Sequence, residues 1–220
     1  MQKIRLVTGG FAIFIVFILG GCGHSIDTPL QKDPTKSPFA HDTKSVPGIS
    51  TSYCAPDAGG VYPGETILIT KKLDNGQHDV GEGGACILKS LADVWHSSQT
   101  EEALSWDRAT LKWLKEIKPA PSGTLLALQS FYDAGFFQNF TIDWIHKDLD
   151  GPADAPTKIL ITYNKVKGTS YISFWEGSIE LQALTPTVTS VRMTNEISAA
   201  QTGPEEAAKA VKDMITRLRK

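Results

Sequence analysis

Residues 158–197 read KILITYNKVKGTSYISFWEGSIELQALTPTVTSVRMTNEI, and this stretch decides the fold. Residues 158–166 and 169–184 are rich in β-branched and aromatic side chains, and Lys167-Gly168 between them is a turn signal. A third strand is predicted over residues 187–197. Strands that follow one another through short turns pair antiparallel, so this part of the chain predicts an antiparallel meander.

The second and third of these strands each have one apolar face, because side chains alternate across a strand. The side chains expected to point into the core are Ile179, Leu181, Val191 and Met193. Glu176 and Glu180 lie on the opposite face, where we expect a solvated surface and not paired acid–base chemistry. Gly177 between them is a candidate β-bulge.

The end of the chain predicts an amphipathic helix. Gly203 is a tolerable N-cap, and Pro204 suits the first helical position. The apolar side chains that share one face at helical spacing are Ala207, Val211, Met214, Ile215 and Leu218. We expect this face to pack on the sheet.

Shorter elements are predicted upstream. Residues 66–70 and 85–88 have strand composition, and Gly81 to Gly84 between them is predicted to be a glycine-rich connection. Ser90 can cap a short helix that begins at Leu91. A second helix is predicted from Thr100 to residue 117, because the apolar side chains Leu111, Leu114 and Ile117 recur at every third position.

Three segments resemble the START-like superfamily of polyketide cyclases and lipid-transport proteins. Residues 86–95 (CILKSLADVW) are similar to the family's first strand and the short helix that follows it. Residues 175–181 (WEGSIEL) and 188–191 (VTSV) are similar to its last two strands. The resemblance covers about residues 65–220. It implies an α+β fold in which a curved antiparallel sheet grips a long C-terminal helix.

Many members of that superfamily hold an apolar ligand between sheet and helix, so the resemblance implies binding of a hydrophobic small molecule or lipid. The side chains that would line the pocket are Phe140, Ile142, Trp144, His146, Tyr171, Trp175, Ile179, Leu181, Val191, Met193, Val211, Met214 and Ile215. His146 would be a polar handle for the ligand, or alternatively a satisfied histidine at a strand end. The apolar members would equally suit a solid, close-packed core.

Three functions therefore stay open. The first is a non-catalytic, membrane-tethered binder of an apolar ligand. The second is an envelope protein with a filled core that acts through protein interactions or as a structural component. The third is a cyclase-type enzyme, for which His146 is the polar group that can be named. No serine has a nucleophile-elbow context, so the sequence identifies no catalytic residue and no cofactor.

The N-terminus predicts a bacterial lipoprotein. Residues 1–21 have the layout of a signal peptide, with an apolar run over residues 6–19 that is too short to span a bilayer. Leu19-Gly20-Gly21-Cys22 resembles a lipobox, so Cys22 is predicted to carry acyl chains, palmitate among them, as a membrane anchor. Residues 22–49, rich in proline and polar side chains, predict a flexible tether, and residues 50–220 predict one domain.

A lipoprotein of this kind belongs to the cell envelope. Gly23 is not the aspartate associated with inner-membrane retention, so the periplasmic face of an outer membrane is expected in a Gram-negative organism. In other bacteria the outer face of the cell membrane is expected.

Cys54 and Cys86 remain after the lipobox cysteine. In an exported chain an even pair predicts one disulfide, with two free thiols as the alternative. The five histidines are scattered, so no metal site is predicted. A formal net charge of −2 without a clustered basic face argues against a nucleic-acid partner. The sequence leaves the oligomeric state open.

Overall fold

The computed structural model describes residues 51–63, 67–72, 78–106, 109–135, 138–200 and 203–220. The predicted signal peptide, the lipobox cysteine Cys22 and the tether therefore lie outside the described residues. The strands are β1 (Ile67–Lys72), β2 (Asp79–Ile87), β3 (Thr110–Glu116), β4 (Thr124–Gly135), β5 (Gln138–Asp150), β6 (Lys158–Gly168), β7 (Ile172–Thr185) and β8 (Val188–Ala199). The helices are α1 (Leu91–Ser97), α2 (Glu101–Leu104), α3 (Pro204–Leu218) and a short 3-10 helix, η1 (Thr51–Cys54).

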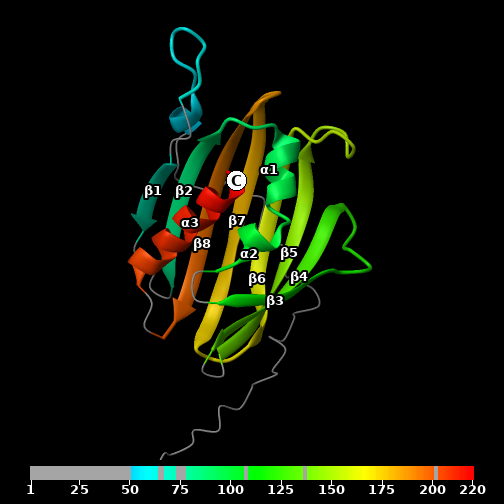
Figure 1. Cartoon of the computed structure of the whole chain (residues 1–220), viewed down its shortest axis with the longest axis vertical. Helices are drawn as coiled ribbons and strands as arrows, with labels where there is room; N and C mark the ends of the chain where they lie inside the picture. The colour runs from blue at the N-terminus through cyan, green and yellow to red at the C-terminus, as the bar shows by residue number, and fades with distance from the viewer. Residues whose placement is uncertain (1–50, 64–66, 73–77, 107–108, 136–137, 201–202) are drawn as a thin grey trace, which may run out of the picture.

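Within these ranges the strands form one antiparallel sheet in the order β1-β2-β8-β7-β6-β5-β4-β3. From β3 to β8 each strand pairs with the next one along the chain, which confirms the predicted meander. β2 pairs with β8, so the first two strands extend the sheet beyond the last one. The three α-helices lie over one face of the curved sheet (Figure 1). No helix of the described part is long and apolar enough to cross a membrane.

Helix α3 packs across β1, β2 and β8 on this inner face. It begins after Gly203 with Pro204 at its first position, as predicted. A Cβ atom at Gly81 would overlap the Ala207 carbonyl group, so the missing side chain lets the helix approach the strand closely. The predicted apolar face is buried: Ala207, Val211, Met214, Ile215 and Leu218.

The prediction of a connection from Gly81 to Gly84 is wrong, because these residues lie inside strand β2. Gly81 faces helix α3, and Gly84 lies under the ring of Tyr53 on the opposite face. The glycines of β2 therefore allow close approach on both faces of the sheet, and they do not form a turn.

The prediction of a long second helix is also wrong. Helix α2 ends at Leu104, and residues 110–116 form the edge strand β3. Leu111 and Leu114 are three residues apart, yet both pack on the core, because the register with β4 shifts between Leu111 and Trp113. This irregularity produces helix-like spacing on a strand. Strand β4 was not predicted at all.

Two predictions on β7 are corrected as well. The strand keeps its register with both neighbours through Gly177, so no bulge occurs there. A Cβ atom at this position would overlap the Tyr163 hydroxyl, so only glycine fits there without a shift of Tyr163. Glu180 is not solvated: its side chain is 4% exposed and forms ion pairs with Arg192 and Lys158.

Cys54 and Cys86 form a disulfide, as predicted, which joins η1 to β2. The Tyr53 hydroxyl donates to the Val191 carbonyl oxygen at 2.9 Å, so η1 is fixed to the face of the sheet opposite α3. The residues of the buried clusters lie between Tyr53 and Leu218. Residues 50–220 therefore hold their own core and are expected to fold by themselves.

Reduction of this disulfide is expected to lower the free energy of unfolding by about 3 kcal/mol, mainly because the cross-link restricts the unfolded chain. The two cysteines are 32 positions apart in sequence. Urea unfolding of residues 50–220 with and without a reductant measures the change. The Cys54→Ser, Cys86→Ser double variant is the control, since the reductant should not change the urea midpoint of its unfolding. A wild-type midpoint that does not move would contradict the prediction.

Candidate functional site

The interior between the sheet and α3 brings together most of the predicted lining residues. The buried ones are Phe140, Ile142, Trp144, His146, Trp175, Ile179, Leu181, Val191, Met193, Val211, Met214 and Ile215. Tyr171 differs, because it is half-buried in the turn between β6 and β7. These side chains of the strands and of α3 are buried, while their role as a ligand pocket stays a prediction.

Trp106 lies at the centre of an aromatic cluster in this interior. It belongs to the connection between α2 and β3, and its side chain is 8% exposed. The centroid of its ring is 4.4 Å from that of Trp175, 6.3 Å from that of Trp144 and 6.1 Å from that of Tyr163. These three side chains form aromatic walls around the Trp106 ring and belong to β7, β5 and β6. The sheet therefore holds the walls in place, whereas Trp106 lies on a connection between two elements.

Hydrogen bonds fix the walls of the cluster. The Oδ1 atom of Asn195, a fully buried residue of β8, accepts from the Tyr163 hydroxyl and from Trp175 Nε1, both at 2.7 Å. Trp144 Nε1 donates to Ser130 Oγ at 2.7 Å. The three aromatic walls are therefore anchored through their polar ends as well as by packing.

Tyr132 joins the cluster to helix α2, since its hydroxyl donates to the Leu104 carbonyl oxygen at 2.7 Å. Burial raises the pKa of the Tyr132 hydroxyl, and the neighbouring Ser130 and Trp106 side chains and the charge of Arg217 oppose this rise. The charge of Arg217 therefore lies within electrostatic reach of the Tyr132 hydroxyl.

Three buried N–H donors around this cluster have no hydrogen-bond partner among the described residues: Trp106 Nε1, Asn195 Nδ2 and Arg217 Nη1. A buried donor without a partner costs about 1–3 kcal/mol. Such groups are rare in native proteins and call for a water, an ion or a functional role. Because all three are donors, each would be satisfied by a hydrogen-bond acceptor.

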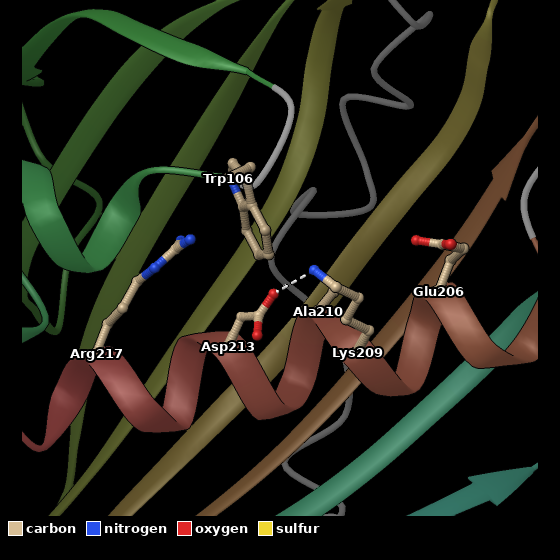
Figure 2. Close-up of a pocket in the computed structure, with 6 residues that line it drawn as sticks. All are labelled: Trp106, Glu206, Lys209, Ala210, Asp213 and Arg217. Atoms are coloured by element: carbon tan, nitrogen blue, oxygen red, sulfur yellow. Dashed lines mark hydrogen bonds and ion pairs between the residues drawn. The ribbon is translucent and has the colours of Figure 1, made fainter.

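A surface pocket beside α3 leads to Trp106 (Figure 2). Its volume is about 60 Å³, and its lining residues are Trp106, Glu206, Lys209, Ala210, Asp213 and Arg217. Figure 2 shows the guanidinium of Arg217 and the indole nitrogen of Trp106 directed into the space between them. The volume of this pocket is far below the roughly 300–1,000 Å³ of typical ligand pockets. A larger ligand could enter here only if Trp106 moved.

His146 lies elsewhere in the interior and contacts helix α1. Trp95 Nε1 donates to His146 Nδ1 at 2.9 Å, so the proton of the neutral ring is on Nε2, a buried atom without a partner among the described residues. Burial lowers the pKa of His146 to about 3. The ring is therefore neutral at physiological pH and a weak base, held in the core and not at the mouth of a cavity.

Acid is expected to destabilise the protein through His146. The unfolded chain binds this proton near pH 6.5, whereas the folded state does not until about pH 3, so stability falls as the pH falls through this window. Between pH 7 and pH 4 the loss is about 3 kcal/mol from this residue alone. Urea unfolding of the wild type and of His146→Asn, in which the amide oxygen can replace Nδ1, measures it. His96→Asn on the exposed side of α1 is the control and should keep the acid sensitivity. Titration of the His146 ring near pH 6.5 by NMR would contradict the expectation.

Trp106, Asn195 and Arg217 were not predicted from the sequence as site residues. One signal was present for Asn195, which has the same strand parity as Val191 and Met193 and was therefore bound to point into the core. Within the described residues no cluster of His, Cys, Asp and Glu side chains could hold a metal ion.

Neither a family model nor a curated protein matches the sequence. Among solved structures, the lipid transfer and protein localization domain of human StarD13 matches with a TM-score of 0.50 and 12% identity, over 71% of this chain and 87% of that domain. A STAR-related lipid transfer protein fragment from Xanthomonas axonopodis has a TM-score of 0.45 and 14% identity, over 72% of this chain and 100% of that one. The Zhui aromatase/cyclase from Streptomyces has a TM-score of 0.38 and 10% identity, over 70% and 87%. The match to the StarD13 domain shows that this chain has the START-like fold.

Proposed function

We propose that this protein is a membrane-tethered lipoprotein of the cell envelope whose START-like domain binds a hydrophobic small molecule or lipid without catalysing a reaction. The observation that carries the proposal is the position of Trp106. Its ring fills the space between three anchored aromatic walls, beside a surface pocket, and its buried N–H has no partner among the described residues. A ligand that moves this ring aside would take its place.

Three free-energy contributions decide whether a ligand can replace the Trp106 ring. The apolar body of the ligand would bury surface against the same walls, at about 25 cal/mol for each Å². The Trp106 N–H would regain a hydrogen bond to water and recover about 1–3 kcal/mol. The burial of the Trp106 ring itself opposes the exchange. Because Asn195 and Ser130 hold the walls, the binding space would persist after the ring has left.

The fold and the predicted tether support the same function. The StarD13 domain, which shares the fold, is described as a lipid transfer domain. In a START-like arrangement the sheet grips the C-terminal helix, and the ligand lies between them. An acylated Cys22 would hold the domain at a membrane surface, where apolar ligands concentrate.

Metabolic labelling tests the tether. Cells that produce the full chain are grown with an alkyne-bearing palmitate analogue, and we expect label on the wild type and none on Cys22→Ser. Cys54→Ser is the control, because it removes a cysteine outside the lipobox. Equal labelling of wild type and Cys22→Ser would rule out this anchor.

Native mass spectrometry of residues 50–220, purified from a bacterial host, tests ligand binding. We expect a fraction of the protein to carry extra mass that denaturation releases. Ala210→Trp should abolish it by blocking the pocket, since Ala210 lines its wall on α3. Lys212→Trp, on an exposed position of the same helix, should not. Absence of bound mass in every sample, even after incubation with a lipid extract, would count against the proposal.

A second candidate function is an envelope interaction protein with a filled core. It is favoured by the small pocket volume of about 60 Å³ and by the burial of the predicted lining residues. The native mass experiment separates the two, because a filled core retains nothing. A cyclase-type reaction gains no such support: His146, with a pKa of about 3, would be a poor general base at neutral pH.

A further inference from the structure

Arg217 lines the pocket and carries a buried N–H group without a partner among the described residues. It lies in the last turn of α3, and its side chain extends toward Trp106 at one side of the pocket (Figure 2). Its Nη1 atom is buried and has no hydrogen-bond partner among the described residues. Burying one N–H of a guanidinium group without a hydrogen-bond partner is costly, so the position needs a reason.

The carboxylates around Arg217 are already engaged. Asp213 forms an ion pair with Lys209 at 2.8 Å, and Glu102 forms one with Lys220 at 2.6 Å. No ion pair joins Arg217 to another residue of the described part. Lys220 lowers the pKa of Glu102 through its hydrogen bond and its charge, and the charge of Arg217 adds to this effect. The Nη1 donor of Arg217 is thus available to something that enters the pocket.

We propose that Arg217 binds the carboxylate head of an amphiphilic ligand whose apolar body takes the place of the Trp106 ring. The inference rests on the proposed function and specifies its ligand class. Arginine binds carboxylates through parallel N–H···O hydrogen bonds, which are stronger and more directional than those to a neutral oxygen. The body of the ligand would extend from the pocket between Trp144, Tyr163 and Trp175.

The surroundings favour a carboxylate over a phosphate. The space beside Arg217 is about 60 Å³, which suits a small planar head. A phosphate would bring nearly two negative charges close to Asp213 and Glu102, and one arginine cannot offset them. A neutral head would offer Arg217 Nη1 only an uncharged acceptor, which gives a weaker hydrogen bond.

Calorimetric titration of residues 50–220 tests the inference with three probes of equal chain length: decanoate, decanol and decyl phosphate, each below the concentration at which it aggregates. We expect decanoate to bind at least about tenfold more tightly than decanol, as a charged hydrogen bond implies. Arg217→Gln should reduce the ratio of decanoate to decanol affinity to about one, and circular dichroism shows whether the variant is folded. Lys212→Gln makes the same charge change on the exposed side of α3 and should keep the preference.

Each other result has a distinct meaning. Equal binding of decanoate and decanol by the wild type, or a preference that survives Arg217→Gln, would overturn the assignment of the head and leave apolar binding intact. Tighter binding of decyl phosphate than of decanoate would overturn the choice of carboxylate. Failure of all three probes to bind would overturn the proposed function itself.

Discussion

Asn195→Ala is expected to lower the free energy of unfolding by about 4 kcal/mol. The substitution removes one oxygen that accepts two hydrogen bonds, from Tyr163 and Trp175, in a fully buried position. Each donor left without a partner costs about 1–3 kcal/mol, and the lost side chain leaves a cavity as well. Urea unfolding of residues 50–220 measures the effect.

Asn164→Ala is the matched control for this substitution. Asn164 lies on β6 next to Tyr163, but its side-chain oxygen has no hydrogen-bond partner among the described residues. Its loss should cost less than about 1 kcal/mol. Similar costs for the two variants would show that the bonds of Asn195 do not hold the walls.

A double-mutant cycle isolates the bond to Tyr163. Tyr163→Phe alone should be destabilising, because it removes the donor to Asn195. In the Asn195→Ala background the same change removes a hydroxyl that is already unpaired, so it should be neutral or stabilising. Additive effects would contradict the proposed network.

The sequence was sufficient for elements whose local pattern agrees with their environment. Alternation on β7 and β8 indicated which side chains face the core under α3, and the apolar stripe of α3 indicated its contact with the sheet. In each case a single periodicity indicates the side chains that face the core. These features also carried the resemblance that implied the START-like fold.

The failures have a common physical origin in close approach and irregular pairing. On β3 a register shift brought Leu111 and Leu114 to the same side, which imitates a helix. On β2 the glycines that admit α3 and Tyr53 imitate a turn. Both depend on a partner far away in the sequence, so no local pattern could reveal them.

The site was harder to predict than the fold for the same reason. Trp106 lies within the segment mistaken for one long helix, and its role follows from aromatic side chains that three strands supply. Arg217 reads from sequence as a favourable charge at a helix end. Only the packing of α3 beside Trp106 shows that its guanidinium faces a pocket.

Trp106→Ala should increase the affinity of residues 50–220 for decanoate by about 100-fold. Displacing a buried tryptophan ring costs about 3 kcal/mol, and this cost lowers the affinity of the wild type. Without the ring, the space between Trp144 and Trp175 is open before the ligand arrives. The same loss of packing should lower the free energy of unfolding by about 3–5 kcal/mol.

Trp113→Ala provides the control for this last prediction, because Trp113 is 38% exposed on the edge strand β3 and stacks on Phe131 away from the cluster. It should leave decanoate affinity unchanged and cost less than about 1 kcal/mol of stability. The two readouts of Trp106→Ala distinguish the two candidate functions. Lost stability with a gain in affinity identifies the ring as the occupant of a ligand space. Lost stability without that gain identifies it as part of a core that binds nothing.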